Sequence, residues 1–114
     1  MNKWDIVIIR YPFTDLTAMK ARPAVVISPN PQGVGDDAVF IAITSNTACN
    51  GPHDVLFPSS DPEFKVSGLL HDSAIKVDKI FTLHKSLVAK VLGTLGPGTQ
   101  LKVKNQLAQF LGLS

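Results

Sequence analysis

Short apolar runs dominate the first 95 residues of the chain. Five of them are rich in Val, Ile or Phe and are bounded by Pro, Gly, Asn or Asp, which is the pattern of β-strands. They cover residues 5–10, 24–28, 38–44, 55–57 and 74–83, and residues 88–95 form a sixth candidate. The first three runs are almost continuously apolar. This favours strands covered on both faces, or a tightly curled barrel, over a flat sheet with one solvated face.

The hydrophobic period changes after Gly96-Pro97-Gly98. Apolar side chains at Leu101, Leu107, Ala108, Phe110 and Leu111 recur at helical spacing, which predicts a helix over residues 99–111, closed by Gly112. Such a helix caps the barrel or packs at a subunit interface. The stretches at 47–55 and 58–68 are predicted to be surface loops. Short strands followed by one helix predict a small, mostly β (α+β) barrel, as a single domain spanning residues 1–114.

Composition sets the class of protein. The 114 residues are 45% hydrophobic and 18% charged, which is typical of a globular chain. The net charge of +2 permits a polyanionic partner without requiring one. The single cysteine, Cys49, excludes an intramolecular disulfide and favours a reducing cytosol. The N-terminus lacks a signal-peptide pattern, and no apolar run is long enough to cross a membrane.

Several kinds of site find no support in the sequence. His53, His71 and His84 are isolated and lack zinc-ligand spacing, so surface polarity explains them better than a metal site. Cys49 has no neighbouring group that would activate a thiolate. A phosphate-binding glycine loop and a Gly-x-Ser-x-Gly elbow are also missing. We therefore predict neither a metal nor a cofactor.

Polar residues at the predicted strand ends remain as candidates. Arg22 precedes the second strand, and Thr44-Ser45-Asn46 closes the third. If these strands form a hairpin, Arg22 and Thr44 lie near the same end. A guanidinium binds phosphate bidentately, and hydroxyl groups complete its shell. Phe13, in the first loop, can stack on an unpaired base. The structural alternatives stay open: Arg22 can pair with Asp15, Thr44-Ser45-Asn46 can be an ordinary turn, and Phe13 can belong to the core.

At these residues the sequence resembles the MazF/PemK family of toxin endoribonucleases from bacterial toxin–antitoxin pairs. The matching segments follow one another through nearly the whole chain: DIVIIRYPFTDL, KARPAVVIS, FIAITSN, GLLHDSAIKVDKIFTL, VAKVLGTL and LAQFLGL. Many members have glycine before the first aspartate, where this chain has Trp4. His84 also stands in a stretch that is often acidic in the family.

The resemblance implies an SH3-like barrel of the MazF/PemK/CcdB type, usually a homodimer, acting in the bacterial cytoplasm. It implies metal-independent cleavage of single-stranded RNA, often mRNA, and a cognate antitoxin whose acidic, partly disordered C-terminal segment blocks the RNA groove. The catalytic residues of the family map onto Arg22 and Thr44. The positions matched to the RNA path are Phe13, Thr14, Asp15, Lys20, Ser45, Asn46, Ser73 and Lys76.

In cleavage of this type the RNA 2′-OH attacks the adjacent phosphorus, which gives a 2′,3′-cyclic phosphate and a 5′-OH end. Arg22 suits stabilisation of the phosphate oxygens, and Thr44 can add a hydrogen bond. Because arginine stays protonated in proteins, Arg22 can donate to the leaving oxygen while water or the phosphate accepts the 2′ proton. His53 or His84 is the rival acid/base. Two other functions remain open: a catalytically inactive RNA- or antitoxin-binding barrel, and a CcdB-like poison of DNA gyrase.

Overall fold

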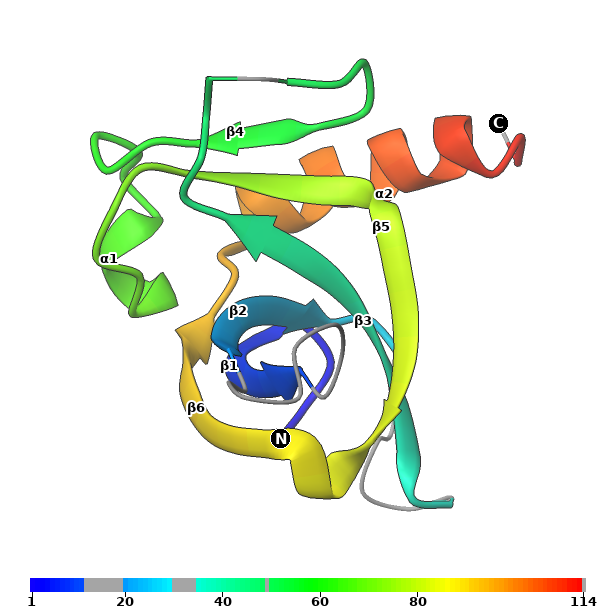
Figure 1. The fold of residues 1–114 in the computed structure, drawn as a ribbon. Helices are drawn as coiled ribbons and strands as arrows, with labels where there is room; N and C mark the ends of the chain where they lie inside the picture. Colours follow the sequence, from blue (N-terminus) through cyan, green and yellow to red (C-terminus); the bar gives the residue numbers. More distant parts are fainter. Residues whose placement is uncertain (12–19, 30–34, 49, 114) are drawn as a thin grey trace.

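A six-stranded antiparallel sheet forms the body of the protein in the computed structural model, which describes residues 1–11, 20–29, 35–48 and 50–113. The strand order is β4-β5-β3-β2-β1-β6. Figure 1 shows the sheet curling into a half-barrel, with the C-terminal helix lying across one end. The strands are β1 Asp5–Tyr11, β2 Lys20–Val26, β3 Asp37–Thr44, β4 Val55–Phe57, β5 Ser73–His84 and β6 Val88–Thr94. The predicted mostly β class with a terminal helix is confirmed.

Apolar side chains pack on both faces of the sheet. One cluster contains Val25 and Ile41 and is closed by Val103 from the C-terminal helix α2, Pro97–Phe110. A second cluster contains Ala24, Val26 and Phe40, and it lies on the opposite face because neighbouring strand residues alternate. The apolar runs of these strands are therefore continuous because both faces of the sheet are covered, as the sequence predicted.

The curl of the sheet has an identifiable cause in the pairing of β3 with β5. Ile41 pairs with Ile80, but the next residue, Ala42, pairs with Lys76. Residues 77–79 of β5 therefore have no counterpart on β3, and an insertion of this kind bends a strand. Figure 1 shows the sharp turn in β5, which folds one half of the sheet over the other.

Trp4 has a left-handed backbone conformation, with φ of 75°. Its N–H donates to the carbonyl oxygen of Val26 at 2.7 Å, and its own carbonyl oxygen accepts from the N–H of Leu95 at 3.0 Å. Glycine adopts this conformation without steric cost, which gives a physical reason for glycine at this position in the family that the sequence resembles. The indole packs against the first apolar cluster.

Two sequence predictions need correction. The second strand begins at Lys20 instead of residue 24, so Arg22 lies within β2, where it pairs with Ile9 of β1. The predicted surface loop at 58–68 contains a one-turn helix, α1 (Phe64–Ser67). A short 3-10 helix, η1 (Lys85–Leu87), also joins β5 to β6. The second strand also ends at Val26, two residues before its predicted end, and the boundaries of the other five strands agree with the prediction to within one residue.

The predicted terminal helix is confirmed as α2, together with its end. Gly112 has φ of 70°, and the N–H of Leu113 donates to the carbonyl oxygen of Ala108. This is the left-handed glycine closure expected after a helix. Among the described residues, no helix is long and apolar enough to cross a membrane.

Candidate functional site

Arg22 and Thr44 lie at one end of two neighbouring strands. Strand β2 starts there and β3 ends there, and the two strands pair through Ala24 with Ala42 and Val25 with Ile41. Continuing this register by two residues would place Arg22 opposite Thr44. Side chains at opposed positions of an antiparallel pair share a face of the sheet, so the sequence prediction that these residues share one end agrees with the strand arrangement.

Pro23 gives a reason for the pairing to stop where it does. The ladder between β2 and β3 covers Ala24 to Val26 and ends directly beside Pro23, which has no N–H to donate. The backbone of Arg22 therefore lies beyond this ladder while still pairing with Ile9 on the other side. Arg22 is exposed and Thr44 is half-buried. Both are placed to meet a ligand at this end of the sheet.

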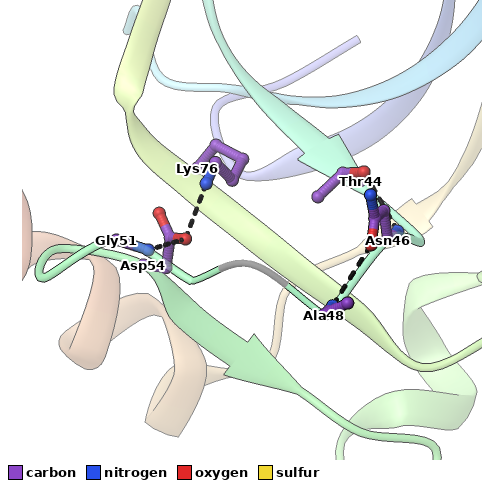
Figure 2. Close-up of polar contacts among 6 residues, drawn as sticks. All are labelled: Thr44, Asn46, Ala48, Gly51, Asp54 and Lys76. Atoms are coloured by element: carbon purple, nitrogen blue, oxygen red, sulfur yellow. Dashed lines mark hydrogen bonds and ion pairs between the residues drawn. The ribbon is translucent and has the colours of Figure 1, made fainter.

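Lys76 joins this end of the sheet from β5, but its charge is already partnered. Thr44 pairs with Ala74 of β5, and Lys76 follows two residues later on the same face. The Nζ of Lys76 lies 2.7 Å from Oδ2 of Asp54, and Figure 2 shows the same carboxylate accepting from the N–H of Gly51. The Asp54 side chain is 1% exposed and that of Lys76 is 19% exposed. The charge of Lys76 is therefore largely balanced before any ligand binds.

The residues after β3 form a hydrogen-bonded turn. Oγ1 of Thr44 accepts from the N–H of Asn46 at 3.1 Å, and Oδ1 of Asn46 accepts from the N–H of Ala48 at 3.2 Å (Figure 2). The alternative that Thr44-Ser45-Asn46 forms a turn is therefore correct. It does not exclude a functional role, because a hydroxyl that accepts one bond can still donate its own hydrogen.

A groove of about 350 Å³ opens beside Arg22, between the starts of β2 and β5, the end of β3, the middle of β6 and the segment before β5. We call it the Arg22 groove. Its floor is mainly apolar, and its polar lining residues are basic, imidazole or hydroxyl groups. The lining residues are Ile8, Ala21, Arg22, Pro23, Ile43, Ser45, Gly68, Leu69, Leu70, His71, Ser73, Lys90 and Leu92.

The wall of the groove formed by residues 68–73 is packed closely against β6. A Cβ on Gly68 would lie 2.3 Å from the carbonyl oxygen of Leu92, and a Cβ on Gly93 would lie 2.2 Å from that of Val66. Only glycine permits such an approach of two backbones. Gly68 also has φ of 74°, which ends α1 and turns the chain toward the groove.

Hydrogen bonds fix the same wall at its other end. Oγ of the buried Ser73 donates to the carbonyl oxygen of His71 at 2.8 Å. Oδ1 of Asp72 accepts from the N–H of Ser59 at 2.7 Å. This bond, more than the nearby His71, lowers the pKa of the Asp72 carboxyl, so Asp72 stays ionised and holds the wall to the preceding loop.

The predicted site residues are divided between the two faces of one sheet end. Ser45 and Ser73 line the groove, whereas Thr44 and Lys76 lie on the opposite face, which carries Ala24 and Ala42. The register places Arg22 on the same face as Thr44, and Arg22 also lines the groove. Asn46 follows Thr44 in the turn. Phe13, Thr14 and Asp15 lie outside the described residues, and so does any ion pair between Arg22 and Asp15. Lys20 is described only as the backbone partner of Tyr11.

The two histidines considered as acid/base groups make their contacts elsewhere. His53 contacts Gln106 and the ring of Phe110 on α2. The Nδ1 of His84 lies 2.8 Å from Oγ of Ser86, and its Nε2 lies 3.9 Å from Asp36. Neither lines the Arg22 groove. Within the described part of the chain, no group of three or more His, Cys, Asp or Glu is placed to hold a metal ion.

Sequence reasoning missed His71 and Lys90 as lining residues of the groove. His71 was considered only as a metal ligand, which its isolated position did not support. Lys90 pairs with Ile8 across β1 and β6, more than 80 residues apart in the chain. No local pattern carries that register, so the sequence held no signal for it.

The fold and the site define a small half-barrel β protein with a basic groove at one end of its sheet. Residues 2–111 match the family of PemK-like, MazF-like toxins of type II toxin–antitoxin systems. The chain belongs to this family. Among curated proteins, no sequence matches it significantly.

Solved structures of the same fold align with this chain over almost its whole length and over almost the whole of their own. An endoribonuclease in complex with its cognate antitoxin from a mycobacterial species is 27% identical, with a TM-score of 0.74, over 100% of this chain and 97% of its own. MazF of a MazE-MazF structure from Deinococcus radiodurans is 22% identical, with a TM-score of 0.75 and coverages of 100% and 97%. Mycobacterium tuberculosis toxin MazF-mt6 is 17% identical, with a TM-score of 0.76 and coverages of 96% and 98%.

Proposed function

We propose that this toxin is an endoribonuclease that cleaves single-stranded RNA without a metal ion. The observation that carries the proposal is the position of Arg22 and Thr44 at one end of adjacent strands, in a chain of this toxin family. The mycobacterial endoribonuclease of the same fold supports the reaction class. The RNA 2′-OH attacks the adjacent phosphorus and the 5′-oxygen leaves, giving a 2′,3′-cyclic phosphate and a 5′-OH end.

Arg22 stabilises the negative charge that develops on the phosphate oxygens. Its exposed guanidinium can donate two parallel hydrogen bonds, a geometry that fits two oxygens of one phosphate. Thr44 adds a hydrogen bond from its hydroxyl, which still has its hydrogen to give after accepting from Asn46. Both groups hold the phosphate for in-line attack. Water or a phosphate oxygen accepts the proton of the 2′-OH, and Arg22 donates a hydrogen bond to the leaving 5′-oxygen, which takes up a proton from water as it leaves.

The remaining residues matched to the family extend the RNA path around this centre. Ser45 and Ser73 supply hydroxyl groups along the Arg22 groove, and Asn46 supplies an amide in the turn that follows Thr44. Lys76 contributes a positive charge that is moderated by Asp54. Phe13, Thr14 and Asp15 from the first loop, and Lys20 at the start of β2, complete the proposed path.

The partners follow from the family and from the surface. We propose that the toxin acts as a homodimer in the bacterial cytoplasm, and that its cognate antitoxin neutralises it by laying an acidic, partly disordered C-terminal segment in the RNA groove. The antitoxin complex of the mycobacterial endoribonuclease supports such a partner. Exposed Leu101, Leu111 and Leu113 at α2 and the C-terminus offer apolar surface for association.

Cleavage of a single-stranded RNA by purified protein in the presence of EDTA tests the proposal. Wild type should cut it, and Arg22→Ala should lose about 10²–10³-fold in kcat, as when a charge-stabilising group is removed from an active site. Arg22→Lys should recover only part of this, because an ammonium cannot bind two oxygens in a fixed fork. Arg10→Ala, an exposed arginine of β1, is the matched control.

Three results would contradict the proposal: full activity of Arg22→Ala, complete loss of wild-type activity in EDTA, or no cleavage of any RNA by wild type. Trapping of DNA gyrase without RNA cleavage would favour the gyrase-poison alternative. Binding of RNA or antitoxin without either activity would indicate an inactive binding barrel.

A further inference from the structure

We propose that the Arg22 groove is a binding site for one nucleotide next to the scissile phosphate, and that His71 and Lys90 determine its affinity and base preference. This inference rests on the proposed ribonuclease function, which it extends from the reaction centre to a neighbouring subsite. Neither residue belongs to the segments that carry the catalytic assignment.

The groove is built before any ligand arrives. The reciprocal backbone contacts of Gly68 and Gly93 hold its wall against β6. The bonds from Ser73 to the carbonyl of His71 and from the N–H of Ser59 to Asp72 fix the other end of that wall. A preformed site binds without the entropic cost of ordering its own residues. A volume of about 350 Å³ lies at the small end of the range for small-molecule sites, which suits a single nucleotide.

The chemistry of the lining selects a nucleotide over other occupants. Ile8, Ile43 and Leu92 offer an apolar surface against which a base can lie. Arg22 and Lys90, both exposed, bring two positive charges to the same groove, and none of its described lining residues is acidic. An apolar surface beside two cations matches a base attached to a phosphate.

His71 and Lys90 have separable tasks in this site. Lys90 projects from the middle of β6, opposite Ile8, and can contact a backbone phosphate as a point charge. His71 is exposed at the fixed wall, where its imidazole can stack on a base or bond to its edge. Lys90 therefore acts on every sequence alike, whereas His71 discriminates among bases.

The subsite adjoins the reaction centre through Arg22. The strand register places this arginine on the same face of the sheet as Thr44, and it also lines the groove. A strand of RNA that places its scissile phosphate at Arg22 and Thr44 would pass over the sheet end and deliver the adjacent nucleotide into the groove.

Binding measurements separate the two residues. The probe is a short RNA that contains the mapped cleavage site with a 2′-deoxy substitution at the attacking nucleotide, so that it binds without being cut. Lys90→Ala should weaken binding roughly tenfold, as for a lost charge-assisted bond. It should also make the slope of log K against log salt shallower by about 0.7, the value for one phosphate of a single strand. Lys102→Ala, an exposed lysine of α2, should change neither quantity.

Base recognition is tested with cleavable RNAs in which one nucleotide beside the scissile phosphate is abasic. Wild type should lose roughly tenfold or more in kcat/KM on one of these RNAs, as for a lost stacking contact. In His71→Ala that penalty should shrink, and the cleavage sites mapped on mixed RNA should become less selective at that position. His84→Ala, whose ring contacts Ser86 instead, should keep the wild-type preference.

The outcomes distinguish this inference from the function on which it rests. If wild type cuts RNA but both variants keep its salt slope, abasic penalty and cleavage pattern, the subsite is refuted and the ribonuclease proposal stands. Variants that weaken only the binding of an antitoxin peptide would assign the groove to a peptide and refute the nucleotide site. If wild type neither binds nor cuts RNA, both proposals fail together.

Discussion

At the scale of single residues, Trp4 shows a conflict between backbone and side chain. Its φ of 75° costs a non-glycine residue about 1–2 kcal/mol relative to the right-handed region. The partly buried indole offsets this by packing on the first apolar cluster, which contributes a share of the roughly 1.5–3 kcal/mol that full burial of a large apolar side chain provides. The amines of Lys3 and Lys104 lie 5.3 and 5.8 Å from the ring centre, which adds a weak cation–π attraction.

Comparison of Trp4→Gly with Trp4→Ala separates these two contributions. Both variants lose the indole, so both should be less stable than wild type. Trp4→Gly should be the more stable of the two by about 1 kcal/mol, because only Ala retains the cost of the left-handed conformation. Urea unfolding followed by circular dichroism measures the difference. The reverse order, which is normal for exposed positions with negative φ, would contradict the role assigned to this backbone conformation.

Arg22 illustrates what a local pattern can and cannot predict. Its chemistry and its place at one end of a core strand followed from the sequence KARPAVVIS. Its inclusion within β2 did not, because Pro23 suggested a strand that starts after it. Proline is tolerated here because the β2–β3 ladder ends beside it, and this is a property of the sheet that the sequence does not display locally.

At the scale of elements, segments distant in sequence secure one another around the site. The N-terminus of α2 carries no acidic side chain in its first turn, and Glu63, from the segment before α1, supplies the charge instead. Its carboxylate accepts from the N–H groups of Gly98 and Thr99 and from Oγ1 of Thr99. The hydroxyl of Thr99 is the main cause that lowers the pKa of Glu63 below its ordinary value of 4.5, and the two N–H groups add to it.

Glu63→Gln should therefore destabilise the protein in a pH-dependent way. A carboxyl group whose pKa is lowered by folding contributes stability above its unfolded pKa, and this contribution is lost as the pH falls through the folded pKa. The variant should be less stable than wild type at pH 7, and the difference should shrink as the pH falls below the ordinary glutamate pKa of 4.5 and through the lowered pKa of folded Glu63. Thermal unfolding across this range measures the convergence. Asp78→Asn, an exposed residue of β5, should show no comparable pH-dependent gap.

The Asp54–Lys76 pair ties the loop before β4 to β5 in a similar way. Asp54→Asn removes the charge that balances Lys76 in a largely buried position, so we expect a loss of about 3 kcal/mol in the free energy of unfolding. Urea denaturation measures this loss, with Asp37→Asn, at the exposed first residue of β3, as the control. A change below about 0.5 kcal/mol would place the pair among the surface ion pairs that contribute little.

The elements that the sequence predicted are those with strong local patterns. Residues 55–57 and the end of α2 at Gly112 were predicted because apolar spacing and glycine mark them directly. Helix α1 was missed because a single turn has too few residues for a helical period. The bend in β5 was missed because it arises from unequal pairing with β3, which no local pattern encodes. The site residues divide in the same way. Arg22 and Thr44 lie in segments that the sequence pattern identifies, whereas Lys90 reaches the groove only through the pairing of β6 with β1, which are distant in the chain.

At the scale of the whole molecule, the net charge is too small for general electrostatic attraction to account for the proposed RNA binding. The net charge is +2, so affinity must come from a few well-placed cations. Arg22 and Lys90 face the groove, whereas Lys76 is balanced by Asp54. Proteins that neutralise six to ten phosphates depend steeply on salt, and this molecule offers no comparable basic surface in its described groove.

The salt dependence of binding to a short, non-cleavable single strand should accordingly be shallow. Two phosphate contacts at about 0.7 each predict a slope of log K against log salt near −1.4, or about a sevenfold loss of affinity between about 50 and 200 mM salt. Fluorescence anisotropy with a labelled RNA measures the slope. A slope steeper than about −4 would mean that the lysines of the C-terminal third also contact RNA, because six or more single-stranded phosphates would then be neutralised. A shallow slope would place the binding charge in the groove, where a site of modest electrostatic strength must obtain its selectivity from base contacts.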